Sequence, residues 1–276
     1  MIDVLLDTLL DIVKLLPFLF ISFLILELLE HKLSTKSKRV ITSSGKFGPL
    51  IGALLGGIPQ CGFSVVATNF YVTRVITLGT LIAIYLSTSD EMLPILLANQ
   101  VSIIEIVKIV GLKVVIGMVV GFIIDFITHS TIKEDFNICE DDHCDCNHSL
   151  IKSAIIHTLK TLLFIGIATF ILNITFYFIS EDSIKKLFLS NYVIGSFLSP
   201  LLGLIPNCAA SVILTELYLN GVLTLGTTIG GLLTGSGVAI LILFKNNKNV
   251  KENLKIVGII YAIGVISGLI LNIIGI

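Results

Sequence analysis

Two Pro-amide-Cys tripeptides are the residues of this sequence best suited to binding chemistry. They are Pro59-Gln60-Cys61 and Pro206-Asn207-Cys208, and a glycine precedes each by three residues. A thiolate binds soft metal ions, and the N-terminus of a helix lowers the pKa of a nearby thiol. Proline ends one helix and leaves such a terminus free where the next helix begins. Packing in a core is the simpler interpretation of one cysteine, but a matched pair favours a binding site.

Amide and hydroxyl side chains stand at matched positions around the two cysteines. We expect the amides of Gln60 and Asn207 to complete a binding shell together with hydroxyls from the segments that follow, namely Ser64 and Thr68 in the first half and Ser211 and Thr215 in the second. Each threonine lies about one helical turn beyond its serine, because a helix has ~3.6 residues per turn. The matched set therefore predicts one polar face on each segment.

Ionisable residues inside apolar segments form a second group of candidates. Asp90 and Glu91 follow Ser87-Thr88-Ser89, and Glu216 occupies the position that corresponds to Asn69. A charge within a membrane is costly and by default indicates a substrate or proton site. The alternative is that the two adjacent acids cap a broken helix at the membrane interface.

The candidate residues belong to a duplicated segment. Gly56–Asp90 returns as Gly203–Gly237 with a constant offset of 147 residues, and this offset pairs Ser89 with Ser236, so both serines join the candidate site. The second copy replaces the two adjacent acids by glycine and valine. A shared fold alone therefore does not require the acids, which favours a functional role for them.

The same offset continues into a long apolar helix in each half. Gly117-x-x-x-Gly121 in the first half corresponds to Gly264-x-x-x-Gly268 in the second. Small residues at this spacing let two helices approach closely within a membrane. We therefore predict that these glycines form packing contacts and take no part in chemistry.

The composition places the chain in a lipid bilayer. It is 55% hydrophobic and 13% charged, with a mean hydropathy of +1.02, which is outside the range of soluble domains. Several runs are long and apolar enough for a hydrocarbon layer of ~30 Å, at 15–29, 114–124, 162–179 and 256–276. The acidic start is not expected to be a cleaved signal peptide. No basic stripe suggests a nucleic-acid partner.

The apolar segments predict an all-α integral membrane protein with two repeats of about five hydrophobic segments each. In the first repeat, 47–58 and 62–72 are too short to cross the layer, and we interpret them as a re-entrant helical hairpin or as two tilted short helices. A helix over 75–89, interrupted at 87–91 and resumed at 92–98, and a crossing helix over 107–128 follow. The domains are then a first repeat at 1–128, a linker at 129–149 and a second repeat at 150–276.

Charges in the loops predict that the two repeats are inverted. The basic segment 30–46 is expected inside, and the turn 99–105, which has no basic residue, outside. At the matching places in the second half the pattern reverses, because 181–192 has balanced charges and 245–255 holds four lysines. An odd number of crossings per repeat gives this inversion. We therefore expect a multi-pass cell-membrane protein with both termini outside and the linker in the cytoplasm.

The linker combines thiols, imidazoles and carboxylates. Its candidate metal ligands are Cys139, His143, Cys144, Cys146 and His148. Their spacing fits no named zinc finger, and a solvated tether is the alternative. The Cys and His enrichment favours metal capture or sensing, with the cysteines reduced in the cytoplasm.

Three motifs carry a resemblance to a known family. Pro59–Ser64, Arg74–Leu81 and Ser87–Pro94 resemble the ten-helix heavy-metal exporters, bacterial and archaeal proteins also called arsenic efflux proteins or manganese transporters and related to organoarsenical permeases. The resemblance covers essentially the whole chain, including the linker rich in histidine, cysteine and acids. It implies a metal or metalloid exporter but does not identify the ion.

These observations predict a secondary transporter that exports a heavy metal or metalloid by alternating access, without a cofactor. Coupling to a proton or cation gradient is expected, since no phosphate-binding GxxxxGK[ST] motif occurs. Two thiols would suit arsenic(III), zinc or cadmium, and carboxylates and amides would suit manganese or iron(II). The alternatives are a passive channel and a membrane-embedded enzyme such as a lipid pyrophosphate phosphatase, in which Asp90, Glu91 and Arg74 would hold a metal and a phosphate. A homo-oligomer is compatible with the sequence.

Overall fold

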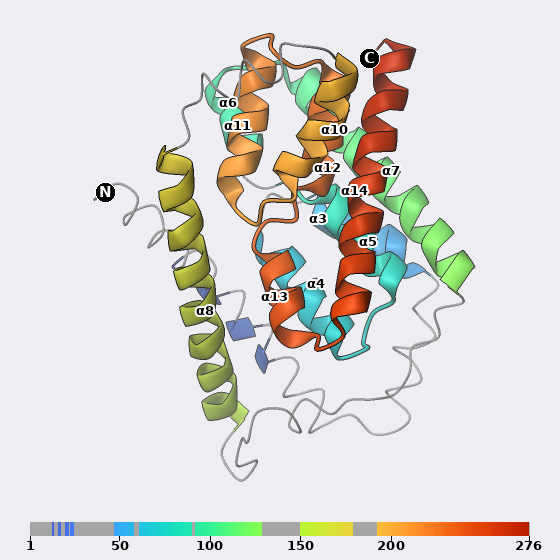
Figure 1. Cartoon of the computed structure of the whole chain (residues 1–276). Helices are drawn as coiled ribbons and strands as arrows, with labels where there is room; N and C mark the ends of the chain where they lie inside the picture. Colours follow the sequence, from blue (N-terminus) through green and yellow to red (C-terminus); the bar gives the residue numbers. More distant parts are fainter. Residues whose placement is uncertain are drawn as a thin grey trace.

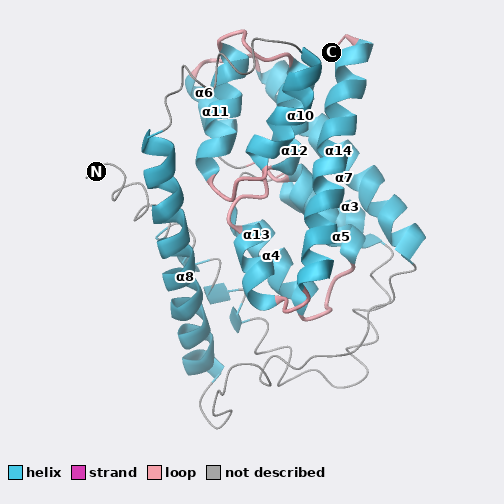
Figure 2. Ribbon diagram, viewed as in Figure 1, coloured by secondary structure: helices cyan, strands magenta, loops and turns pink. Residues whose placement is uncertain are grey.

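The computed structural model describes residues 47–57, 61–89, 92–128, 150–178 and 192–275, with isolated residues between 13 and 24. The regular elements of these ranges are α-helices (Figures 1 and 2). The first half contains α3 (Gly48–Gly56), α4 (Cys61–Val72), α5 (Leu78–Ser87), α6 (Met92–Ala98) and α7 (Ile103–Thr128). The second half contains α8 (Leu150–Phe178), α10 (Tyr192–Gly203), α11 (Cys208–Leu219), α12 (Leu225–Thr234), α13 (Ala239–Asn246) and α14 (Val250–Ile274).

Two interrupted helices form the centre of the molecule. The stretches Leu78–Ala98, which contains α5 and α6, and Leu225–Asn246, which contains α12 and α13, are mostly buried by the rest of the chain. The long helices α7 and α14 instead expose many apolar side chains, including Ile104, Phe126 and Ile273. Within the described ranges, these four stretches are long and apolar enough to cross a membrane. Exposed apolar side chains on the outer helices are suited to contact with lipid. Together with the helical elements, they confirm the prediction of an all-helical membrane protein.

Two pairs of short helices flank, in sequence, the tripeptides that carry the cysteines. The predicted segments 47–58 and 62–72 are the helices α3 and α4, and their counterparts are α10 and α11. In Figure 1, α10 and α11 both lie in the upper half, and the turn that joins them lies near mid-height. The side chain of Asn207 in this turn accepts a hydrogen bond from Ala209 N at 3.1 Å and so caps α11.

Equivalent helices pack against equivalent neighbours in the two halves. α5 packs against α3 and α7, and α12 packs against α10 and α14. Contacts between the halves include those of α5 with α12, of α4 with α13 and of α6 with α11. Figure 1 places α4 and α13 low and α6 and α11 high, so the last two of these contacts lie toward opposite ends of the molecule.

Glycines permit the close approach of α7 to α5 and of α14 to α12. A Cβ atom at Gly121 would lie 2.7 Å from the carbonyl oxygen of Gly79, and one at Gly264 would lie 2.7 Å from that of Gly230. Real Cβ atoms do not come so close to backbone oxygens. The prediction that the GxxxG pairs are packing contacts is therefore confirmed.

The two interrupted helices begin with the same cap. Thr77 Oγ1 accepts a hydrogen bond from Thr80 N at 3.2 Å, and Thr224 Oγ1 accepts one from Thr227 N at 3.2 Å. Asp125 from α7 then accepts from the Thr77 hydroxyl at 2.6 Å and from Gly79 N at 2.8 Å. At the matching place, Asn272 from α14 accepts from the Thr224 hydroxyl. Each long outer helix thus anchors the start of its interrupted neighbour.

Several predicted boundaries differ from the observed ones. α5 begins at Leu78 and not at residue 75, because Thr77 caps it, and α7 begins at Ile103 and not at residue 107. The basic turn expected over 245–255 is shorter, since α13 ends at Asn246 and α14 begins at Val250. These helix boundaries are set by local caps and turns, which the hydropathy of the sequence does not reveal. The linker 129–149 lies outside the described residues.

Candidate functional site at the helix breaks

Each interrupted helix has a non-helical break near its middle, in the interior of the molecule. The first break, residues 88–91, lies between α5 and α6, and the second break, residues 235–238, lies between α12 and α13. Thr88 and Ser89 in the first break are buried, and so is the whole of the second break. Backbone polar groups at helix ends lose their partners within the helix. Helix-end peptide groups are therefore concentrated at two places in the buried interior.

A lysine from α7 contacts the first break. Lys113 is 1% exposed, and its Nζ atom donates a hydrogen bond to the carbonyl oxygen of Thr88. A cation suits this place, because the C-terminal end of a helix carries partial negative charge. The sequence motifs did not single out this residue. Its signal was a basic residue within an apolar stretch, which by itself marks a functional candidate.

The second break has a buried hydroxyl without a hydrogen-bond partner among the described residues. Ser236 is fully buried, and its Oγ atom makes no hydrogen bond to the described part of the chain. The backbone N–H of Ser236 donates a hydrogen bond to the carbonyl oxygen of Thr234 at 2.9 Å. Ser89, the matching residue of the first break, is also buried, but its hydroxyl donates to the carbonyl oxygen of Ser87 at 3.2 Å.

The predicted hydroxyls of α4 and α11 are buried beside the interrupted helices. Ser64 and Thr68 are fully buried in α4, and the Thr68 hydroxyl lies 2.5 Å from the Tyr85 hydroxyl of α5. Tyr85 also donates to the carbonyl oxygen of Ala239 at the start of α13, at 3.4 Å. This chain of contacts joins α4, α5 and α13, and the sequence pattern did not identify Tyr85.

Matching hydroxyls line α11 in the second half. Ser211 and Thr215 are buried, and a Cβ atom placed on Gly235 would lie 3.2 Å from the Ser211 hydroxyl oxygen. Ser211 therefore lies directly against the second break. Thr215 donates to the carbonyl oxygen of Ser211 at 2.7 Å, as Thr68 does to that of Ser64.

Two further predicted site residues have different surroundings. Asn69 is buried, and its Oδ1 atom accepts a hydrogen bond from Asn246 of α13 at 2.9 Å. Glu216, at the matching position of α11, is exposed on this chain. Gln60, Asp90, Glu91, the side chains of Cys61 and Cys208, and the linker ligands lie outside the described residues. Among the described side chains, no group of three or more His, Cys, Asp or Glu residues could hold a metal ion.

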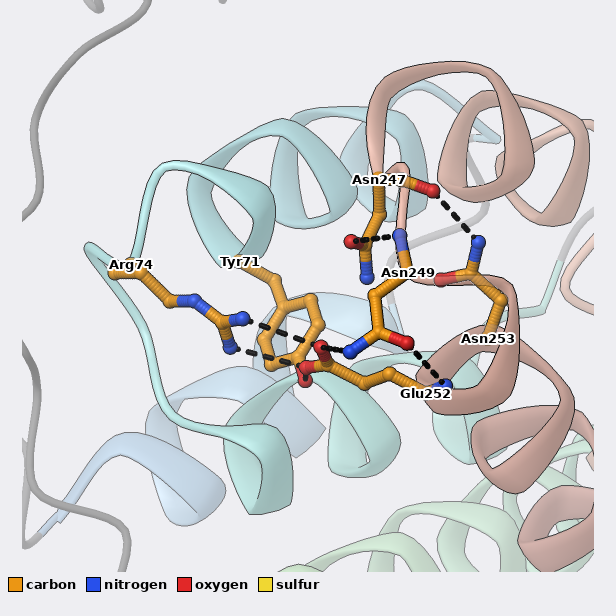
Figure 3. A network of polar contacts seen from close by, with 6 residues as sticks. All are labelled: Tyr71, Arg74, Asn247, Asn249, Glu252 and Asn253. Atoms are coloured by element: carbon orange, nitrogen blue, oxygen red, sulfur yellow. Dashed lines mark hydrogen bonds and ion pairs between the residues drawn. The ribbon is translucent and has the colours of Figure 1, made fainter.

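An ion pair joins the two halves at the turn after α4 (Figure 3). The two guanidinium nitrogens of Arg74 lie 3.0 and 3.2 Å from the two carboxylate oxygens of Glu252 in α14. Tyr71 donates to the same carboxylate, and Asn249 does so at 3.4 Å. The hydrogen bond to Glu252 raises the pKa of Arg74 above its ordinary value. Since Arg74 is held at this turn, it does not support the phosphate-binding role considered for an enzyme.

The equivalent contact at the other end is simpler. Tyr218 of α11 donates to the carboxylate of Glu105 in α7, and these residues correspond to Tyr71 and Glu252 through the offset of 147. Gly221 stands where the first half has Arg74, and both residues have positive φ, 70° and 59°. The backbone turn is thus shared, whereas the ion pair occurs on one side.

We expect Glu252→Ala to lower the free energy of unfolding by about 2 kcal/mol and Glu105→Ala by about 1 kcal/mol, because the first change also leaves Arg74 without this carboxylate. The pair is partly exposed, 41% and 20%, so a double-mutant cycle of Arg74→Ala with Glu252→Ala should give a coupling of only ~0.5–1 kcal/mol. Denaturation of the purified variants in detergent measures these values. If Glu252→Ala and Glu105→Ala lowered the free energy of unfolding equally, the ion pair of Arg74 with Glu252 would not contribute to stability.

The fold and these contacts define a class of protein: a multi-pass helical membrane protein with interrupted helices and buried polar breaks. A family model described as "Putative, 10TM heavy-metal exporter" matches residues 1–174. The chain belongs to this family, which confirms the resemblance found in the sequence. Membership supports metal transport in general terms. No curated protein and no solved structure matches the chain.

Proposed function

We propose that this protein is a secondary active transporter that exports a heavy-metal ion or metalloid through alternating access of two inverted repeats. The observation that carries the proposal is the pair of buried breaks in matched helices, each beside a hairpin that carries a cysteine. Broken helices at matching positions of two repeats are typical of the central site of a transporter. Family membership supports the same activity.

Reciprocal contacts between the halves support the inverted arrangement. Tyr71 of the first half contacts Glu252 of the second, and Tyr218 of the second contacts Glu105 of the first. An exchange of this kind is what a two-fold axis relating the halves produces. Because the helices that carry the tyrosines lie toward opposite ends of the molecule, the axis would lie in the membrane plane.

The substrate would bind between the hairpin tips and the breaks. Cys61 and Cys208 would supply thiolates, and the shell would be completed by the amides Gln60 and Asn207 and the hydroxyls Ser64 and Ser211. Asp90 or Glu91 would exchange a proton with the transported ion. Thiolates suit arsenic(III) or zinc, whereas a site led by carboxylates suits manganese or iron(II).

The linker would face the cytoplasm and deliver metal to this site. Its ligands would be Cys139, His143, Cys144, Cys146 and His148, and the two termini would lie outside. Removal of 139–148 is then expected to weaken the metal response without abolishing transport. Transport and binding equal to those of the wild type would contradict this role.

The proposed function is tested by flux into and out of proteoliposomes. As(III), Mn(II), Fe(II) and Zn(II) would be compared for the wild type and the Cys61→Ser/Cys208→Ser double variant, with protein-free vesicles as the control. We expect flux of one ion and at least a tenfold loss in the double variant, which equals ~1.4 kcal/mol. If flux persisted in the double variant, the two thiols would not be the binding site, and Asp90 and Glu91 would be the next candidates.

Dissipation of the ion gradients separates active export from a passive channel. An active exporter stops accumulating its substrate when the coupling gradient is removed, whereas a channel continues to equilibrate it. If none of the four ions moves in the wild type, the exporter proposal fails.

A further inference from the structure

We propose that the second break, residues 235–238, is a binding site for a small monovalent cation of the Na⁺ type. The site would supply the coupling ion of the proposed transporter, so its role in coupling rests on the proposed function. The binding itself does not. It follows from the different chemistry of the two breaks: the first contains Asp90 and Glu91 in its sequence and contacts Lys113, whereas the second, Gly235–Val238, contains no ionisable residue.

A side chain of the protein supplies a positive charge at the first break. The Lys113 ammonium group donates to the carbonyl oxygen of Thr88, directly after the last turn of α5. One turn along α7, Gly117 packs against the same end of α5, since a Cβ atom there would lie 3.5 Å from Ser87 N. Lys113 thus places an ammonium group against backbone oxygen at this break.

The second break has the same frame without this charge. Gly264 corresponds to Gly117 and packs against Thr234, because a Cβ atom there would lie 2.6 Å from the Thr234 methyl group. The residue that corresponds to Lys113 is Ile260. It is fully buried, and its side chain has no hydrogen-bond donor. Here the only side-chain oxygen of the break, Ser236 Oγ, is fully buried and has no partner within the described chain.

A buried hydroxyl without a partner costs about 1–3 kcal/mol, so a ligand at this place would recover stability. The C-terminal end of α12 adds backbone carbonyls and the negative end of the helix dipole. Neutral hydroxyl and carbonyl oxygens form a hard, weakly charged ligand set, which suits an alkali cation better than a soft or strongly charged metal ion. Unwound backbone at a helix break binds Na⁺ in this way in other transporters.

The test measures thermal unfolding of the full chain in detergent, with NaCl, KCl or N-methylglucamine chloride at equal ionic strength. We expect Na⁺ to raise the midpoint of the wild type by about 3 °C at a concentration tenfold above its Kd. Ser236→Ala should lose this shift, and Ser236→Thr, which keeps the hydroxyl, should retain it. Thr228→Val is the matched control, because the Thr228 hydroxyl lies within the same helix and donates to Thr224 O at 2.9 Å.

Ile260→Lys provides a second, independent variant. A lysine there would place an ammonium group at the second break, as Lys113 does at the first, so its midpoint should no longer depend on Na⁺. This variant keeps the proposal testable if Ser236→Ala does not fold. No Na⁺-specific shift in the wild type, or an unchanged shift in both variants, would overturn the proposal and indicate a water molecule only.

Metal flux in the proteoliposomes of the proposed transport assay separates this inference from the proposed function. If Na⁺ stabilises the protein but no metal moves, the cation site stands and the exporter proposal fails. If metal moves and Na⁺ has no specific effect on either stability or flux, only the cation site is wrong.

Discussion

Gly121→Val and Gly264→Val are each expected to destabilise the protein by about 3 kcal/mol or more, enough to deplete the folded form. The Cβ atom of either valine would lie 2.7 Å from a backbone carbonyl oxygen of the neighbouring interrupted helix. Backbone cannot move aside as a flexible side chain can, so α7 must separate from α5, or α14 from α12. Because α5 and α12 carry the breaks, this separation should also disturb the site. Size-exclusion chromatography of detergent-solubilised protein measures the folded fraction.

The same helices provide matched controls for these substitutions. A Cβ atom added to Gly111 in α7 or to Gly258 in α14 would meet no other atom within 4 Å, and the two glycines correspond to each other through the offset of 147. Gly111→Val and Gly258→Val should leave the folded fraction unchanged, since valine favours helix over glycine. If all four variants behaved alike, close helix approach would not be what these glycines provide.

The duplicated sequence predicted most of what the structure shows of the fold. The offset of 147 residues aligned the hairpins, the interrupted helices and the GxxxG contacts, because each of these depends on glycine, proline or a polar residue at a fixed place in an apolar run. The interruption after Ser87 was located from the run of hydroxyl and acidic residues alone. Burial of Ser64, Thr68, Ser211 and Thr215 agrees with the predicted polar faces.

Contacts between the halves could not be predicted from a repeat. The pairing of Tyr71 with Glu252 joins residues far apart in sequence, and the local contact of Glu252 with Asn249 gives no sign of it. Lys113 was missed for a related reason: the prediction relied on residues that occur in both copies, and the second copy has isoleucine at this position. The sequence therefore contained Lys113 as a basic residue in an apolar run, but only the structure places its ammonium group at the first break.

Lys113→Met is expected to reduce metal flux by at least tenfold, about 1.4 kcal/mol in the transport barrier, while the protein still folds. The change leaves the buried carbonyl oxygen of Thr88 without the Lys113 ammonium group, which should also lower the free energy of unfolding by about 1–3 kcal/mol. Met has nearly the length of the lysine stem, so packing around the side chain is largely kept. Flux in proteoliposomes and thermal unfolding in detergent give the two readouts.

Two variants separate the charge of Lys113 from its bulk. Lys113→Arg keeps a positive charge and should retain more flux than Lys113→Met, although a planar guanidinium fits a site built for a compact ammonium less well. Lys108→Met removes an exposed lysine from the same helix and should change neither flux nor stability. Flux equal to that of the wild type in Lys113→Met would show that the charge at the first break is dispensable. The buried lysine would then serve only to cap the C-terminal end of α5, and transport would depend on the residues at the hairpin tips.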